Sequence, residues 1–330
     1  MKNLKLKKFI IKKNYKKIFT PSPSFPIENL LGLSSNFSRG DNDFNRQYKR
    51  TMSLIKKLSG QKNLISAQGP ASLAIEMGLL NFVKGTVLVI STGFYSDRLY
   101  SILKMSQKKN NFVKKIDKVD YQNLDNVKKK YDWVCACYTE TSKGFKIDIK
   151  KLSKKTKKFK AKMFIDATAS IGIEENHDLA DVVSFSSCKS LFGFTGACFV
   201  GYSLKPTNDV CSFMLDIKSH INKKMTGPNS TIQSLDYVMK NYSKFKKSVI
   251  LNKKDFMKKY KHLTIYDKIN QPNMCTYIDT KVHKKKNLIL YEPRIKTNGS
   301  LIFHLGAGHL EKNLTAINSN IKIKWSKEFV

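Results

Sequence analysis

The stretch VVSFSSCKSLFGFTGACFVGY, residues 182–202, contains the lysine around which the rest of the sequence can be organised. Lys189 stands between an apolar run and a turn rich in glycine and phenylalanine, with no other lysine or arginine within several residues. Most lysines are exposed, but these apolar flanks predict that Lys189 is partly buried. A desolvated lysine amine has a lowered pKa and attacks carbonyl groups. The stretch therefore predicts a reactive amine at the end of a buried strand.

The remaining lysines are numerous and widely spread. The chain of 330 residues has 61 Lys+Arg against 25 Asp+Glu, a formal net charge of +36. Such an excess suggests a partner such as nucleic acid or an anionic surface. Only five of these residues are arginine, the side chain preferred for phosphate and base recognition. A lysine-rich, arginine-poor composition is typical of an AT-rich genome, and no basic face with interleaved aromatics stands out. We therefore expect neither nucleic acid nor a membrane as partner.

The six cysteines show no C-x-x-C pair and no Cys/His spacing suited to zinc, so we expect no metal. Cysteines within apolar runs usually act as small buried hydrophobes, which fits a reducing compartment. No apolar run approaches the roughly 20 residues that a membrane span needs. The basic N-terminus lacks the apolar core of a signal peptide. These features together predict a soluble cytoplasmic protein.

Residues 50 to 205 alternate between helix-like and strand-like segments. The helix-like segments have apolar residues three or four positions apart and comprise residues 50–60, 70–83 and 93–105. The strand-like segments are short apolar runs at residues 63–69, 86–92, 132–140, 162–170, 181–187 and 196–202. Apolar runs separated by helices indicate an α/β fold with a mostly parallel sheet that is buried on both faces.

The pattern changes after residue 230. Residues 231–245 predict a long helix, and short strands are expected at residues 274–280, 288–293 and 301–306. We therefore expect three parts: a basic N-terminal arm, a large α/β domain and a small α+β domain, at residues 1–20, 21–245 and 246–330.

Polar residues follow the predicted strands. In open α/β sheets the ligand site lies outside the carboxyl ends of the strands. Asp166 ends one apolar run, where a carboxylate either caps a helix or faces a cationic group such as a pyridinium nitrogen. The small residues Gly69, Pro70, Ala71 and Ser72 open a helix whose backbone N–H groups can approach a phosphate. Each of these signals is weak by itself.

Tyr95 and Lys189 complete the set. Tyr95 follows another strand-like run, and its ring either packs in a turn or stacks on a planar cofactor. Lys189 comes 23 residues after Asp166, beside Ser186 and Cys188. The order along the chain is a phosphate turn, an aromatic ring, a strand-end acid and a lysine.

That order resembles the class V group of fold-type I pyridoxal 5′-phosphate (PLP) enzymes, typified by 2-aminoethylphosphonate–pyruvate and alanine–glyoxylate (serine–pyruvate) aminotransferases. The matching stretches are FTPSPSFP (19–26), GPASLAIE (69–76), STGFYSDR (91–98), TETSKG (139–144), FIDATASIG (164–172), SFSSCKSLFGFTG (184–196), MTGPNST (225–231) and FHLGAGH (303–309). The resemblance implies a large domain with a mostly parallel seven-stranded sheet sandwiched by helices, plus a small C-terminal α+β domain. It also implies an aminotransferase with PLP as cofactor.

The resemblance implies a role for each residue of the site. Lys189 would hold the cofactor as an internal aldimine and shuttle the proton, Asp166 would pair with the pyridinium nitrogen, and Tyr95 would stack on the ring. Further cofactor contacts are implied for Gly69, Pro70, Ala71, Ser72, Thr141, Thr168, Ser186 and Cys188. Thr226 would reach the phosphate of the neighbouring subunit, which implies a homodimer with shared active sites.

The substrate contacts are less well matched. Ser22 and Ser24 would line the entrance to the site. His304 stands where the family has an arginine that clamps the substrate carboxylate, and Arg294 is the candidate substitute. The implied reaction is ping-pong transamination of a small amino acid or aminophosphonate, as in phosphonate metabolism, with a 2-oxo acid as acceptor.

Two alternatives stay open at this point. The first keeps the cofactor and changes the chemistry to that of a lyase or a desulfurase. A desulfurase needs a nucleophilic cysteine on a mobile loop, whereas Cys188 adjoins the lysine and Cys275 sits in a strand-like segment. The second alternative is a non-catalytic relative with an anion-binding role. Retention of Lys189 and Asp166 argues against this loss of cofactor binding.

Overall fold

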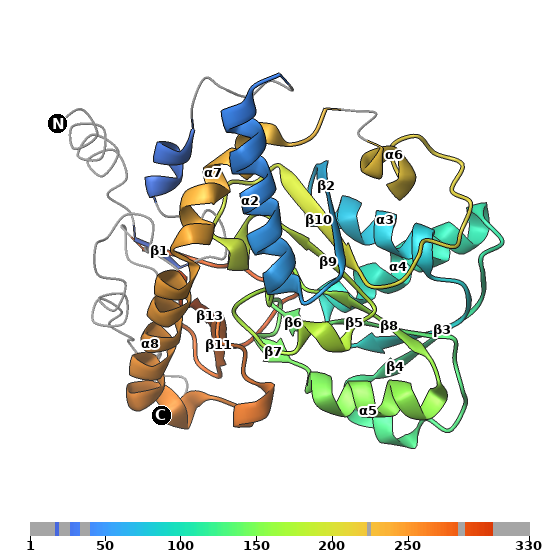
Figure 1. Ribbon diagram of the computed structural model, residues 1–330. Helices are drawn as coiled ribbons and strands as arrows, with labels where there is room; N and C mark the ends of the chain where they lie inside the picture. The colour runs from blue at the N-terminus through green and yellow to red at the C-terminus, as the bar shows by residue number, and fades with distance from the viewer. Residues whose placement is uncertain (1–16, 20–26, 34–39, 223–225, 283–287, 306–330) are drawn as a thin grey trace.

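The computed structural model describes residues 17–19, 27–33, 40–222, 226–282 and 288–305 (Figure 1). Its centre is a seven-stranded sheet in the order β2-β10-β9-β8-β5-β3-β4. The strands are β2 (Asn63–Gln68), β3 (Gly85–Ser91), β4 (Val113–Asp120), β5 (Trp133–Cys137), β8 (Lys162–Asp166), β9 (Val182–Ser186) and β10 (Ala197–Tyr202). Only β10 pairs antiparallel with its neighbours β2 and β9. The prediction of a mostly parallel seven-stranded sheet is confirmed.

Helices cover both faces of this sheet (Figure 1). One face packs on α3 (Ala71–Phe82), α4 (Phe94–Lys109) and α6 (Ile217–Ile221). The other face packs on α2 (Asn42–Ser59), α5 (Ile149–Phe159), α7 (Asn229–Lys240) and α8 (Tyr242–Tyr260). Within β3, Val87 and Val89 join the first core, and Leu88 and Ile90 join the second. Burial on both faces is the reason that the strands read as continuous apolar runs.

Strand β4 and helix α5 are among the elements that had no predicted counterpart. Strand β4 lies at the edge of the sheet and buries only Val113 and Ile116 among its eight residues. Helix α5 buries Ile149, Leu152 and Phe159 and carries lysines on its remaining surface. Each has only a few apolar residues among many lysines, so neither segment shows a clear apolar pattern in the sequence.

The C-terminal part begins within a helical pair. The predicted long helix is two helices, α7 and α8, that meet at Asn241, and the predicted boundary at residues 245 and 246 falls inside α8. Strands β11 (Cys275–Ile278) and β13 (Ser300–Phe303) pair antiparallel. Strand β1 (Lys17–Phe19), from the predicted N-terminal arm, pairs parallel with β12 (Leu288–Leu290). The N-terminal arm therefore contacts the C-terminal part directly.

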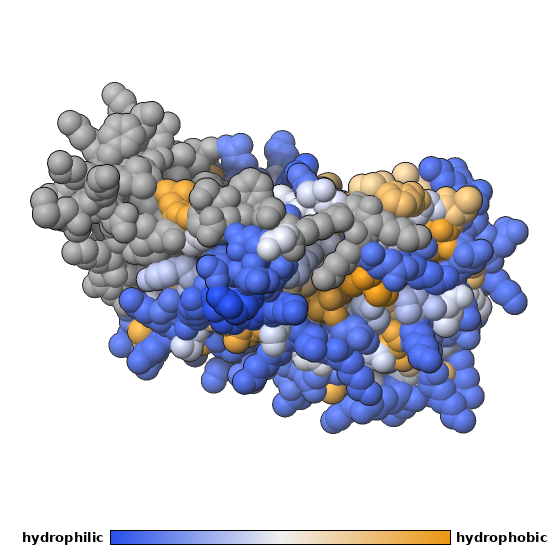
Figure 2. Space-filling view, turned by 45° about the horizontal axis from the view of Figure 1, so that its top comes forward, coloured by the Kyte–Doolittle hydropathy of each residue, from blue (hydrophilic) through white to orange (hydrophobic). Residues whose placement is uncertain are grey.

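Figure 2 shows hydrophilic residues over most of the coloured part of one face, with hydrophobic residues gathered in patches near its middle and at its upper right. No helix in the part of the chain that the structure describes is long and apolar enough to cross a membrane. The described residues likewise contain no cluster of three or more His, Cys, Asp or Glu side chains suited to a metal ion.

Candidate active site

The parallel strands bring the predicted residues to one edge of the sheet. Asp166 ends β8, and Lys189 follows β9 at the same edge. The Nζ atom of Lys189 lies 4.7 Å from the centre of the Tyr95 ring. The guanidinium carbon of Arg98, one turn along α4, lies 5.0 Å from the same ring centre. The phenol thus lies between two cations in the neighbourhood of a buried acid.

The backbone of Lys189 is held in the left-handed region, with φ of 56°. This conformation is costly for a lysine and persists only where its surroundings enforce it. The next residue supplies two such contacts: Ser190 Oγ donates to Thr168 O (3.1 Å), and its own carbonyl accepts from Tyr242 Oη (3.0 Å). The Tyr242 hydroxyl also lies 3.0 Å from Ile171 O. The turn that carries the lysine is therefore fixed from both β8 and α8.

Asp166 is oriented by its neighbours and is only 2% exposed. Its Oδ1 accepts hydrogen bonds from Thr168 N (3.0 Å) and Thr168 Oγ1 (2.6 Å). Its Oδ2 has one long contact, to Arg98 Nη2 at 3.5 Å. Arg98 Nη1 in turn donates to Ser72 Oγ at 3.1 Å, which ties the helix-opening turn to the acid. Oδ2 is consequently the oxygen with capacity to accept from a further donor.

The start of α3 carries no side-chain cap. It follows Pro70, whereas α2 and α5 are capped by the carboxylates of Asp41 and Asp148. A Cβ at Gly69 would lie 2.6 Å from a methyl group of Leu73, so a larger residue there would have to displace that side chain. Exposed N–H groups and the helix dipole make such a helix start suited to an anion such as phosphate.

Glu140, in the short strand β6 (Thr139–Glu140), is a completely buried carboxylate that contacts the first turn of α4. Its Oε2 accepts from the backbone N–H groups of Tyr95 (2.9 Å) and Ser96 (3.1 Å), and its Oε1 accepts from Ser142 N (3.2 Å). Burial raises its pKa, and these hydrogen bonds offset the rise only in part. The contact fixes the backbone of Tyr95 and therefore the position of its ring.

Neither Arg98 nor Glu140 received a role from the sequence. Both lie inside stretches quoted for the resemblance, STGFYSDR and TETSKG. Arg98 could have been noticed as one of only five arginines, placed three residues after Tyr95 and therefore on the same helical face. Glu140 could have been noticed as an acid that ends a buried strand.

Several buried polar atoms in this region have no hydrogen-bond partner. They are the hydroxyls of Thr92, Thr139 and Thr141 and the Nε of Arg98. Buried polar atoms are normally paired, so orphans that gather beside Tyr95 and Asp166 point to a polar group that binds there. A primary amine, an ionisable acid, a ring for stacking and an uncapped helix start accompany them. These residues fit PLP.

Arg294, from the C-terminal segment, lies at the rim of the candidate active site. The Tyr291 hydroxyl lies 3.3 Å from that of Tyr95, and the Arg294 guanidinium carbon lies 5.4 Å from the Phe94 ring centre. Burial raises the pKa of Tyr95, but the positive charge of Lys189 and hydrogen bonds with Tyr291 and Arg294 outweigh it and leave the pKa below its ordinary value. Arg294 is exposed and adjoins Tyr95, whose ring is the one expected to stack on the cofactor.

His304 lies elsewhere. Its ring is fully buried, with Nε2 at 2.9 Å from Thr276 Oγ1, and it packs 5.4 Å from the Phe256 ring of α8. Phe303, on the opposite side of β13, packs instead on Tyr291. The structure therefore gives no support to the expected contact of His304 with substrate, because its fully buried ring faces Thr276 and α8.

Of the remaining predicted residues, some lie beside Lys189 and others do not. Ser186 is buried, and its Oγ lies 3.3 Å from the Sγ of half-buried Cys188 next to the lysine. Thr226 is exposed in the segment before α7. Ser22 and Ser24 lie outside the described residues.

No family model matches the sequence, and no curated protein matches it. Solved structures do match. Pyridoxamine–pyruvate aminotransferase from Mesorhizobium loti has a TM-score of 0.74 at 18% identity, over 92% of this chain and 88% of that one. Alanine–glyoxylate aminotransferase from Nostoc sp. has a TM-score of 0.75 at 13% identity, over 93% and 96%.

A third match is a PLP-bound phosphoserine aminotransferase from Trichomonas vaginalis. Its TM-score is 0.71 at 13% identity, over 93% of this chain and 98% of that one. Each match covers most of both chains, so the likeness includes the C-terminal part as well as the sheet. The chain therefore has the fold of the class V, fold-type I PLP-dependent aminotransferases.

Proposed function

We propose that this protein is a PLP-dependent aminotransferase of class V. The observation that carries the proposal is the position of Lys189 Nζ, 4.7 Å from the Tyr95 ring centre at the edge of the sheet where Asp166 ends its strand. The likeness in fold to aminotransferases supports it. An amine, a stacking ring and a fixed acid together form the minimal set that such chemistry requires.

Each residue of the set has a distinct task. Lys189 attaches the cofactor through Nζ and afterwards holds and moves a proton at that atom. Asp166, oriented by Thr168, would accept a hydrogen bond from the ring nitrogen through Oδ2. When bound, PLP supplies an electrophilic carbon that takes up amines and a ring that withdraws electrons. Tyr95 would pack on that ring, and the buried hydroxyl of Thr141 beside Tyr95 would face its polar substituents.

The phosphate is assigned to the uncapped start of α3. The backbone of Ala71 and Ser72, following Gly69 and Pro70, provides the N–H groups. Ser186 and Cys188 contribute from the lysine side. Thr226 contributes to the site of a second subunit, so the protein acts as a homodimer. Sedimentation of the purified protein tests this, and a monomer with full activity would contradict it.

The substrates are a small amino acid or aminophosphonate as donor and a 2-oxo acid as acceptor. Arg294 is the group proposed to bind their acidic end, since it lies beside Phe94 at the rim and carries a guanidinium suited to bidentate contacts. This replaces His304, whose ring is buried.

The test is the visible absorbance of the protein after incubation with PLP. A visible band that shifts on addition of 2-aminoethylphosphonate, alanine or serine, with transfer of the amine to pyruvate or glyoxylate, is expected. Lys189→Ala should abolish both signals, whereas Lys244→Ala, an exposed lysine of α8, should change neither. A protein that takes up no PLP would contradict the proposal, and release of ammonia without amine transfer would favour a lyase.

A further inference from the structure

A hollow of about 430 Å³ lies at the amino ends of the central strands, on the side of the sheet opposite the candidate active site. Gly85, Trp133 and Lys162, which line it, are the first residues of β3, β5 and β8. The candidate active site lies beyond the last residues of the same strands. A strand rises about 3.3 Å per residue, so the two sites are separated by roughly 15 to 20 Å of sheet. The hollow is named here the basic-edge pocket.

The basic-edge pocket is lined by lysines from four separate parts of the chain, namely Lys84, Lys114, Lys160, Lys162 and Lys205. None of them takes part in an ion pair with another described residue. The one carboxylate in the lining is that of Asp132, whose Oδ2 already accepts from Thr86 N (2.7 Å) and Thr86 Oγ1 (2.8 Å). These hydrogen bonds and the charge of Lys114 lower the pKa of Asp132, so its carboxylate offsets one of the five lysine charges and the lining keeps an excess of positive charge.

Lys160 is a second, independent observation. It ends α5 with φ of 57°, the left-handed conformation that favours glycine at a helix C-terminus. Its own N–H satisfies the carbonyls of Thr156 and Lys157, so the turn itself needs no side chain. The backbone conformation at residue 160 therefore gives no reason for a lysine. Its side chain lines the hollow together with the four other lysines, which gives such a reason.

The pocket also has an apolar wall. Phe82 and Trp133 are buried, and Phe112 and Leu204 are partly exposed at the lining. The pocket thus combines a cationic rim with an aromatic floor.

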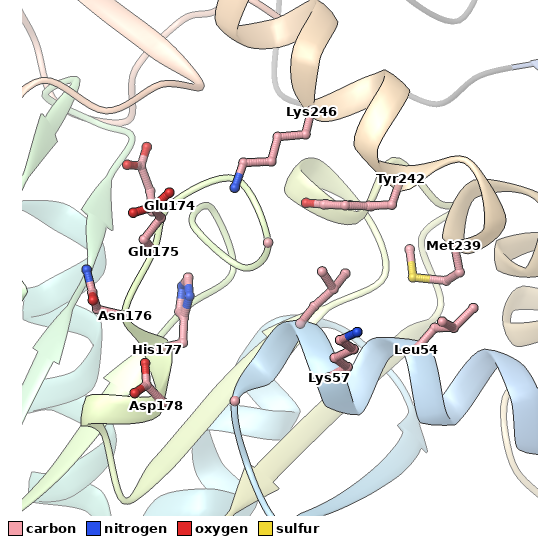
Figure 3. A pocket seen from close by; sticks show the side chains of 13 residues that line it. Leu54, Lys57, Glu174, Glu175, Asn176, His177, Asp178, Met239, Tyr242 and Lys246 are labelled. Carbon is pink, nitrogen blue, oxygen red and sulfur yellow. The ribbon is translucent and has the colours of Figure 1, made fainter.

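A different pocket, of about 460 Å³, shows the contrast. It is lined by Lys57 and Lys246 but also by Glu175 and Asp178, and both signs of charge surround it in Figure 3. Its lining favours no particular charge on a ligand, whereas the basic-edge pocket selects for anions.

We propose that the basic-edge pocket binds a small molecule that carries two or more phosphate groups. Five ammonium groups can neutralise several negative charges, and lysine binds phosphate well as a point charge. The volume lies within the range of small-ligand sites, about 300 to 1,000 Å³. The lysines surround one half-open hollow rather than forming a stripe, which favours a compact ligand over a nucleic-acid strand. The site is independent of the chemistry at the other edge.

Calorimetric titration of the PLP-saturated protein tests the proposal, because added PLP first fills the phosphate site at the other edge. Inorganic triphosphate and ATP should bind saturably, about tenfold or more tightly than AMP, and more weakly at high salt. Tighter binding of ATP than of triphosphate would assign a nucleotide whose base contacts Phe112. Equal binding would assign an inorganic polyphosphate.

Variants locate the binding. Lys114→Gln combined with Lys162→Gln should weaken ATP binding about tenfold or more. Lys160→Gly should weaken it while preserving the helix end. The matched control combines Lys244→Gln and Lys254→Gln on α8, exposed lysines outside every pocket described above. Absence of saturable binding, an equal loss in the control, AMP binding as tight as ATP, or displacement of ATP by a more tightly bound single-stranded RNA would each overturn the proposal.

Discussion

The two edges of the central sheet hold charge in opposite ways. At the carboxyl ends of the strands, Asp166 and Glu140 are buried and accept hydrogen bonds from several segments, and Arg98 bridges Asp166 to Ser72. At the other edge, five lysines are exposed and have no ionic partner among the described residues. The net charge of the chain is therefore a poor guide to function, whereas burial and pairing of a few charges are informative.

The largest effect is expected at Lys189. Lys189→Ala should lower the transamination rate by about 10³-fold or more, because no other amine lies against the Tyr95 ring among the described residues. The measurement is single-turnover conversion of the amino donor. Lys162→Ala, at the other edge, should leave this rate unchanged. Equal losses in the two variants would break the contrast between the edges.

The second effect concerns a cation placed inside the C-terminal part. His304→Arg should destabilise the protein by about 3 kcal/mol or more, because an unpaired guanidinium would be buried against Phe256. Urea unfolding measures this, with His304→Gln as the neutral control that can still reach Thr276. An unchanged midpoint together with faster turnover of amino acids would restore His304 to the substrate site.

The third effect concerns substrate binding at the rim. Arg294→Gln should raise KM for acidic substrates about 10- to 100-fold, the range expected for loss of a hydrogen bond to a charged group. The unfolding midpoint should stay the same, because the side chain is exposed. Arg294→Lys should restore part of the affinity. A fall in kcat without a change in KM would place Arg294 outside the substrate contact.

The fourth effect is a dependence of stability on pH. Burial lowers the pKa of His177 to about 3 and places that of His304 well below its ordinary value. Below a pH of about 6.5 the unfolded chain takes up protons that the folded chain refuses, so stability falls as pH falls, by about 1 kcal/mol per pH unit for each histidine. Unfolding between pH 7 and about 5.5 measures the slope. His177→Gln should reduce it, and an equal slope in that variant would contradict the assignment.

The smallest effect is expected at Lys160. Lys160→Gly should leave the free energy of unfolding unchanged or raise it by up to about 1 kcal/mol, because glycine adopts the left-handed conformation without strain. Thermal unfolding measures it, with Lys154→Gly, at an exposed position in the interior of α5, as a control that should lose stability. Loss of stability in Lys160→Gly would mean that the side chain supports the helix end.

The sequence predicted the sheet and the centre of the site because both depend on local patterns. Buried strands are apolar runs, and the residues that follow them must meet at one edge. Asp166, Tyr95 and Lys189 were found in this way. The role of Arg98 could not be predicted, because it depends on how α4 lies against the start of α3 and the end of β8, which no local pattern records.

What the sequence did not indicate has equally physical causes. His304 was judged by its position in a motif, whereas its ring packs against α8 and that of Phe303 packs on Tyr291. The lysines of the basic-edge pocket are separated by up to about 120 residues and resemble any other surface lysine until the strands align their first residues.

The hydroxyl of Tyr242 connects the beginning of α8 to the peptide that follows Lys189, through its bonds to Ile171 O and Ser190 O. A Cβ at Gly172 would collide with the same hydroxyl, so this close approach requires glycine. Displacement of α8 must therefore either break both bonds or pull the lysine peptide with it. Through these two bonds the position of the turn that carries Lys189 is coupled to the position of the first residue of α8.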